Sequence, residues 1–201
     1  AVVSALILLA LTIAVLLAPV FEMAMGLNAN TVDLFNRFRA PTSGHPLGTD
    51  ELGRDLFLRL LYGGRVSLLV GLVAALFATV IGTAVGLTAG YFGGRTDAFL
   101  MRVTDGVISL PLLPLLIVLA AIDLSKLGLP GTITESESAS LYRIIAIVAL
   151  AGWTTVARLV RASTLSIKQR TFVMAAVAQG GGPIRIMSVH ILPNLASTII
   201  V

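Results

Sequence analysis

Three side chains in the N-terminal half of the chain are of the types that bind metal ions. His45, Asp50 and Asp55 lie close together in one polar stretch. Imidazole and carboxylate groups are zinc ligands, but one histidine with no second histidine nearby makes a weak ligand set. We therefore expect no metal or other cofactor in this chain. We interpret Thr49 or Asp50 as the N-cap of a short amphipathic surface helix that ends near Leu61.

A second chemical candidate is the charge pair Arg102 and Asp105, three residues apart at the start of an apolar run. A charge inside a membrane span is costly and is a functional candidate by default. The alternative is a local ion pair at the membrane interface. We expect no catalytic residues, because the chain contains neither His-Glu-x-x-His nor Gly-x-Ser-x-Gly. The glycine-rich turn 90–97 lacks the Lys-Ser/Thr ending of a phosphate-binding loop, and no Walker-type sequence occurs elsewhere.

The composition predicts the kind of element that carries these residues. Of the 201 residues 57% are hydrophobic and 12% charged, and the mean hydropathy is +0.98. A soluble domain of this size does not need so much apolar surface, so we expect an all-α polytopic transmembrane helical bundle. The net charge of +4 suits the loops of such a protein. No nucleic-acid-binding motif is present, so we expect no nucleic-acid partner.

We expect a single transmembrane domain over residues 1–201. Its spans are predicted at about 1–20, 66–89, 98–122 and 141–159, with the start of a fifth at 191–201. Pro111 and Pro114 should bend the third span. The fifth run is shorter than the ~20 residues that cross a bilayer. Both ends of the chain lie inside apolar runs, so we expect both to be cut.

Small residues repeat every fourth position along the second predicted span. They are Ala78, Gly82, Gly86 and Gly90. Such a stripe lets the backbones of two helices approach closely. We expect it to pack against another helix, either in this chain or in a partner.

The longest basic segment, 161–194, lies between two apolar runs. Its unpaired basic side chains are Lys168, Arg170 and Arg185, which should face water or a polar partner. Residues 171–179 are rich in alanine and contain no glycine or proline, which favours a short helix. Gly180 should end that helix and Pro183 should begin the next. From the residues alone, we favour the interpretation of the segment as a solvated loop that joins two spans.

This segment resembles the cytoplasmic coupling loop of ABC-importer permeases. The family pattern has Glu-Ala-Ala, then a glycine, then His-x-Leu-Pro, and the residues that match it are Ala175, Ala176, Gly180, His190, Leu192 and Pro193. Met174 stands where the family has glutamate. In the family this loop docks into a groove on an ATPase subunit. The resemblance therefore implies a coupling loop over 163–189, with its functional residues Phe172, Met174, Ala175, Ala176, Gly180, Pro183 and His190.

Residues 45–55 and 61–68 resemble the segment before the second span in C-type permeases of the dipeptide, oligopeptide and nickel subgroup. The resemblance covers 41–201 and implies the type I ABC-importer permease fold, which has six spans. It implies half of a peptide translocation pathway that works by alternating access. The implied partners are a B-type permease in a heterodimer, two ABC ATPase subunits that bind ATP and Mg, and an extracytoplasmic substrate-binding protein. The implied location is the bacterial cytoplasmic (inner) membrane, multi-pass and surrounded by lipid.

The resemblance also predicts the orientation. It places 90–97 and 163–189 in the cytoplasm, and 21–62 and 123–140 on the side of the binding protein. The 14 basic residues then divide equally between the two sides, whereas eight of the 10 acids lie outside. An importer for nickel or another small solute is the alternative within the family. A stand-alone channel or ion-coupled carrier is the alternative outside it, and a carrier should show ionisable residues near the midplane of the membrane.

Overall fold

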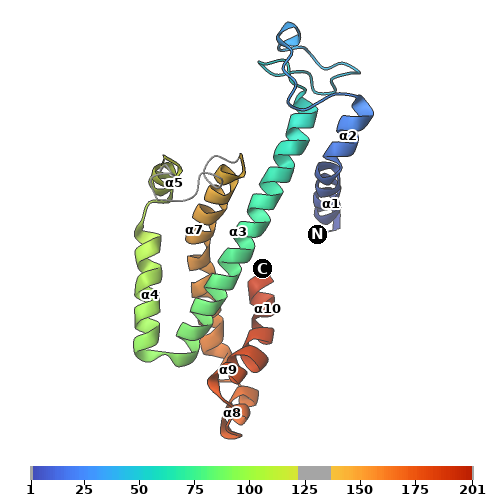
Figure 1. Cartoon of the computed structure of the whole chain (residues 1–201). Helices are drawn as coiled ribbons and strands as arrows, with labels where there is room; N and C mark the ends of the chain where they lie inside the picture. The colour runs from blue at the N-terminus through green and yellow to red at the C-terminus, as the bar shows by residue number, and fades with distance from the viewer. Residues whose placement is uncertain (1, 122–136, 201) are drawn as a thin grey trace. The chain divides into compact units, whose positions relative to one another are not determined.

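The computed structural model describes residues 2–121 and 137–200, and these form helices without a regular strand (Figure 1). The chain divides into two compact units, Ala1–Leu69 and Val70–Val201. Two of the described helices are long and apolar enough to cross a membrane, and a bent pair of helices makes a third candidate if it counts as one span. The expectation of an all-α membrane protein is therefore confirmed.

Unit 1 begins with two helices, α1 (Val2–Leu16) and α2 (Ala18–Met25), whose axes are bent by 56°. The sequence predicted one continuous span over 1–20, so this break is a correction. Pro19 explains it, because proline lacks a backbone N–H and its ring clashes with the carbonyl four residues earlier. Gly26 then ends α2 with a φ of 61°, a conformation that glycine adopts without strain.

The helix α3 (Leu56–Phe92) is continuous over 37 residues. It contains both the end of the predicted short surface helix and the predicted span 66–89, so the prediction of two separate elements is wrong. Its start is set by Asp55, whose carboxylate accepts the backbone N–H of Leu58 at 2.8 Å. This N-cap satisfies one of the free donors at the helix start.

The predicted third span, 98–122, is divided between two helices, α4 (Gly94–Ser109) and α5 (Leu112–Ala121). Pro111 lies at the division. A proline pushes the residue before it into the extended region, and that residue has a ψ of 127°. Pro114 lies in the first turn of α5, where the missing N–H of proline costs nothing. The bend that the sequence predicted is thus a full interruption of the helix.

The helix α7 (Glu137–Ile167) extends beyond the predicted span 141–159 at both ends. Its last turn includes the first residues of the predicted coupling loop. After it come α8 (Thr171–Ala178), α9 (Pro183–Arg185), the π-helix η3 (Ile186–Ile191) and α10 (Leu192–Ile200). The predicted short helix ended by Gly180, and the new helix that begins at Pro183, are both confirmed. Most of the predicted connection 123–140 lies outside the described residues.

The end of α7 and the helices that follow it share one apolar core. Its buried members are Val160, Val173, Ile186, Ile191 and Leu195. Burial of an aliphatic side chain of this size stabilises a fold by about 1.5–3 kcal/mol. Figure 1 shows α8 and α9 at the end of α7. The core therefore fixes α8 to the end of a long helix.

Candidate functional site

The small-residue stripe of α3 lies directly against α7. A Cβ atom added at Gly82 would lie 2.6 Å from the Trp153 carbonyl oxygen, closer than real Cβ contacts come. The contacts pair Ala78 with Gly152, Gly82 with Val156, Gly86 with Val160, and Gly90 with Thr164. The residue numbers of the two partners rise together, so α3 and α7 run parallel. The sequence left the packing partner of this stripe open, and the structure places α7 there.

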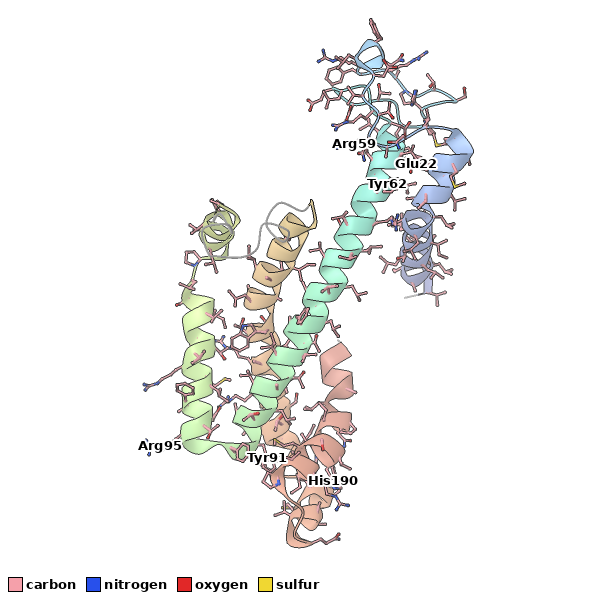
Figure 2. All side chains as sticks on the ribbon, viewed as in Figure 1. Glu22, Arg59, Tyr62, Tyr91, Arg95 and His190 are labelled. Atoms are coloured by element: carbon pink, nitrogen blue, oxygen red, sulfur yellow. The ribbon has the colours of Figure 1, made fainter. Side chains whose placement is uncertain are left out.

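A lysine of α7 caps the end of α3. Lys168 follows the last residue of α7, and its Nζ donates to the carbonyl of Gly90 at 2.9 Å and to that of Tyr91 at 3.5 Å. Figure 2 labels Tyr91 at this end of α3. The last carbonyls of a helix have no partner within the helix and carry partial negative charge, so a cation there is favourable. The sequence predicted that Lys168 faces water or a polar partner, and the carbonyl groups at the end of α3 are that partner.

An ion pair holds the start of α4 against α7. The guanidinium of Arg161 binds Asp97 in two places, from Nε to Oδ1 and from Nη2 to Oδ2, the second at 2.6 Å. These hydrogen bonds lower the pKa of the Asp97 carboxyl below its ordinary value. Asp97 also lies in the first turn of α4, where negative charge is favourable.

A second ion pair joins the same two helices farther along. Arg158 Nη2 lies 2.5 Å from Asp105 Oδ1, and both side chains are more than half exposed. Asp105 therefore pairs with α7, and the predicted pair of Arg102 with Asp105 is wrong. Sequence reasoning missed both pairs between α4 and α7. The available signal was two acids near the start of the predicted span 98–122, one just before it and one within it, and two arginines near the end of the next, antiparallel span 141–159.

The helix α8 forms one wall of a cleft of about 340 Å³. Its lining residues are Phe172, Ala175, Ala176, Gln179, Gly181, Arg185 and His190. Phe172 and the alanines form an apolar wall, whereas Arg185 and His190 supply cationic or hydrogen-bond-donating groups. Figure 2 labels His190 where the chain passes from α9 to α10. Such a cleft can receive a side chain that is partly apolar and ends in an acceptor.

The turn after α8 determines the shape of the cleft. Gly180 has a φ of 81°, which lies in the left-handed region that glycine tolerates best. The N–H of Gly181 donates to the Ala176 carbonyl at 3.0 Å, and this bond closes the end of α8. Pro183 then occupies the first turn of α9. The turn brings Arg185 and His190 back toward α8.

Of the residues predicted for the coupling loop, Met174 stands apart. Four of them, Phe172, Ala175, Ala176 and His190, line the cleft. Successive residues of a helix are rotated by about 100°, so Met174 points away from the face that carries Phe172 and Ala176. The Met174 side chain is 52% exposed and does not line the cleft. The predicted docking set is thus split over two faces of α8.

Comparison with known proteins adds the family. Residues 82–201, which include α4, α7, α8 and the cleft, match the family described as binding-protein-dependent transport system inner membrane component. The chain belongs to this family. The resemblance noted in the sequence is therefore confirmed.

Relatives of this permease carry several transport names. The chain is 32% identical over 201 residues to the oligopeptide transport system permease protein OppC of Bacillus subtilis, covering 100% of this chain and 60% of OppC. It is 37% identical over 161 residues to the dipeptide permease DppC of the same organism (80% and 46%). It is 33% identical over 168 residues to the nickel permease NikC of Escherichia coli K12 (82% and 56%). The chain spans about half the length of these relatives.

The permease has a second polar region, residues 27–55 between α2 and α3, which we call the polar cap. His45 Nδ1 lies 2.9 Å from Asp55 Oδ2, and the Asp55 side chain is 2% exposed. Asp50 pairs with Arg54 at 2.9 Å and with Arg59 at 3.5 Å. Thus the three residues considered as metal ligands are divided between two separate ion pairs. In the described part of the chain, no three His, Cys, Asp or Glu residues are placed to hold a metal.

Glu22 of α2 fastens the polar cap to α3. Its carboxylate accepts the backbone N–H of Ala29 at 3.0 Å and the phenolic O–H of Tyr62. Figure 2 shows Glu22 and Tyr62 directed toward one another. The rings of Phe21 and Phe57 meet edge to face beside them, with centroids 5.6 Å apart. From the sequence, Glu22 could be assigned only to a polar connection, because its partner Tyr62 is 40 residues away.

Proposed function

We propose that this chain is one permease subunit of an ATP-driven ABC importer for peptides in a bacterial cytoplasmic membrane. It forms half of the translocation pathway, paired with a B-type permease. Family membership supports the transport role, and the names of OppC and DppC support peptides as the cargo. The chain itself is non-catalytic, and two ABC ATPase subunits bind ATP and Mg.

The observation that carries this proposal is the way α8 is held. Its inner side chain Val173 is 1% exposed, yet Phe172 and Met174 on either side of it are 44% and 52% exposed. A short helix with a buried anchor and exposed apolar neighbours presents a fixed surface to a partner. We assign this surface, with the cleft beside it, to docking of an ATPase subunit.

The contacts at the end of α7 suggest how movement of the ATPase reaches the pathway. α8 shares a core with α7, Lys168 holds the end of α3, and Arg161 holds the start of α4. A displacement of α8 therefore moves the ends of three helices together. ATP drives the change only if it binds one conformation of the complex better than the other.

The chemistry of the cleft favours an acidic side chain on the ATPase surface. From Arg161 to Val201 the chain contains four basic residues and one histidine but no acid. Arg185 and His190 lie at the cleft, where an aspartate or glutamate would accept charge-assisted hydrogen bonds. Met174 lies outside the cleft, so the loss of the family glutamate leaves this contact intact.

The exposed tip of the polar cap fits contact with an extracytoplasmic substrate-binding protein. The Phe35 side chain is fully exposed and Phe38 is 71% exposed. Phe38 also has a φ of 50°, which is unusual for a residue with a side chain. Large aromatic side chains held out on a loop are typical of protein interfaces.

Retention of ATPase subunits in pull-downs tests the docking assignment. Gly180→Val should strain the turn by about 1–2 kcal/mol, which corresponds to about a tenfold loss of binding, while the chain still inserts in the membrane. Gly182→Val is the matched control, because Gly182 has a φ of −69° and a Cβ there meets nothing within 4 Å. Equal retention by the two variants would contradict the assignment of the α8 surface.

A nickel importer is the second candidate function, since the chain is 33% identical to NikC over 168 residues. Uptake assays with a labelled dipeptide and with Ni²⁺, in cells that express the complete system, separate the two. The peptide proposal predicts uptake of the dipeptide. Uptake of Ni²⁺ alone would reject it in favour of the second candidate.

A further inference from the structure

The four charged residues of α4 are separated by sign. Asp97 and Asp105 both bind arginines of α7. Arg95 and Arg102 are exposed, and neither makes a hydrogen bond or an ion pair within residues 2–121 and 137–200. Figure 2 shows Arg95 at the start of α4, directed away from α3. The acids of α4 thus form ion pairs with arginines of α7, whereas the arginines of α4 have no acidic partner in the described residues.

The two arginines share one face of α4 with an aromatic ring. Arg95, Phe99 and Arg102 follow the spacing i, i+4, i+7, which places them in one row. Phe99 is 67% exposed, and Val103 beside it is 45% exposed. The arginine Cα atoms are about 10 Å apart along the axis at 1.5 Å per residue. This row is therefore apolar between two positive charges.

The opposite face of α4 is the one that packs within the permease. Thr104 is 0% exposed, and Val107 packs against the cluster that contains Trp153 and Ala157. The helical rotation of about 100° per residue puts Thr104 roughly opposite the row. The row of Arg95, Phe99 and Arg102 consequently faces away from the permease core.

We propose that this row binds the phosphate headgroup of an anionic phospholipid. A guanidinium matches phosphate with two parallel hydrogen bonds. Arginine stems lie along apolar surface while their charged ends reach the headgroup level. Phe99 and Val103 supply the apolar contact for the acyl chains. Lipid fits better than an acidic protein surface, because this family consists of inner membrane components and because Phe99 and Val103 expose apolar surface beside the two arginines.

Native mass spectrometry of the full chain, purified in detergent, tests this with phosphatidylglycerol and phosphatidylcholine at equal concentration. We expect phosphatidylglycerol to bind and phosphatidylcholine to bind much less. Each arginine near an anionic surface contributes about a fivefold change in affinity, so Arg95→Gln with Arg102→Gln should weaken phosphatidylglycerol binding about 25-fold. The pair Arg95→Lys with Arg102→Lys should retain part of it, since lysine keeps the charge but not the planar fork.

Arg170→Gln is the control, because it removes an exposed positive charge from outside α4. It should leave lipid binding within about twofold of the unchanged chain, as expected for a charge outside the site. An equal loss with Arg170→Gln would overturn the proposal and show a response to net charge alone. Full lipid binding by the double glutamine variant would also overturn the proposal. The same holds if that variant loses co-purified protein partners while its lipid binding stays intact. Thermal unfolding of each variant establishes that it is folded.

Discussion

The polar cap and the α8 segment, which we define as residues 168–191, are both polar stretches joined to long helices, yet they use their polar groups differently. In the polar cap, His45 pairs with Asp55, and Asp50 pairs with Arg54. The α8 segment contains no acid, and Arg170 and Arg185 remain exposed. In the first region acids and bases pair with one another, whereas the exposed arginines of the second have no acid within their own segment.

The same difference appears in the apolar groups. The polar cap is held mainly by hydrogen bonds, such as those from Leu52 N–H and Arg54 N–H to Asp50 at 2.8 and 3.0 Å. The α8 segment is held by the buried side chains Val173 and Ile186. Hydrogen bonds within the polar cap use its polar groups to hold its shape. The buried apolar side chains of the α8 segment hold its surface in place and leave the polar groups of the segment available. In the α8 segment, exposed arginines therefore lie on a surface that is fixed by the buried side chain of Val173.

The largest predicted effect comes from the helix interface that supports the α8 segment. Gly86→Leu should destabilise the chain by about 3 kcal/mol, because its side chain would collide with the Ala157 carbonyl on α7. Gly71→Leu on the same helix is the control, since a Cβ there meets nothing within 4 Å. Thermal unfolding in detergent measures both. An equal effect of the two substitutions would show that α3 and α7 do not pack through this stripe.

The next effect falls on the polar cap. Asp55→Ala removes the N-cap of α3 and leaves His45 without its partner, which should cost about 2 kcal/mol. Glu51→Ala is the control, because Glu51 is exposed. Hydrogen exchange should increase over 45–58 in the first variant and stay unchanged over 171–191. A similar increase in both regions would mean that the two are not held independently.

A smaller effect separates the two ion pairs between α4 and α7. Asp97→Ala should cost about 1–2 kcal/mol, because Arg161 loses a two-point partner. Asp105→Ala should cost less than about 1 kcal/mol, since its pair with Arg158 is exposed. Exchanging the charges, with Asp97→Arg and Arg161→Asp together, should recover part of the first loss. No recovery, or equal costs for the two single variants, would argue against Asp97 as the stronger tie.

The smallest effect is the response of the polar cap to acid. Burial raises the pKa of Asp50, but hydrogen bonds from Arg54 and Leu52 outweigh it and hold that pKa below its ordinary value. The hydrogen bond from Asn36 likewise lowers the pKa of Asp33. A lowered pKa in the fold gives stability that is complete above the ordinary value of 3.8 and is lost as the pH falls through the lowered one.

Hydrogen exchange over 28–55 should therefore be constant, after correction for intrinsic rates, from pH 8 to about pH 5 and increase below about pH 4. Asp50→Asn should reduce this acid response. An acid response that begins near pH 6 would contradict its assignment to the Asp33 and Asp50 carboxyl groups.

The sequence predicted local features well. The helix before Gly180 and the helix start at Pro183 follow from backbone preferences of single residues, and both are present. The stripe from Ala78 to Gly90 could be recognised from its spacing, though its partner could not. The interruption at Pro111 was foreseen only as a bend, because proline does not reveal how far neighbouring contacts will open a helix.

Features that depend on contacts between distant residues could not be predicted from the sequence. Asp105 has a plausible partner three residues away in Arg102, yet it binds Arg158, 53 residues later. The start of α3 was misplaced because Thr49, Asp50 and Asp55 are all good capping residues, and long-range bonds decide among them. The sequence did not reveal that Met174 lies on a different face of α8 from Phe172 and Ala176.

The central claim is that an ATPase subunit covers the cleft beside α8, and thiol labelling tests it most directly. The chain contains no cysteine, so Ala175→Cys in the cleft, Met174→Cys on the other face of α8 and Glu51→Cys in the polar cap each give one reporter. Adding the ATPase subunits should slow labelling at position 175 about tenfold, at position 174 by less, and at position 51 not at all, as expected when one face is buried in an interface. Labelling at position 175 that is equally fast with and without the ATPase subunits would contradict the claim.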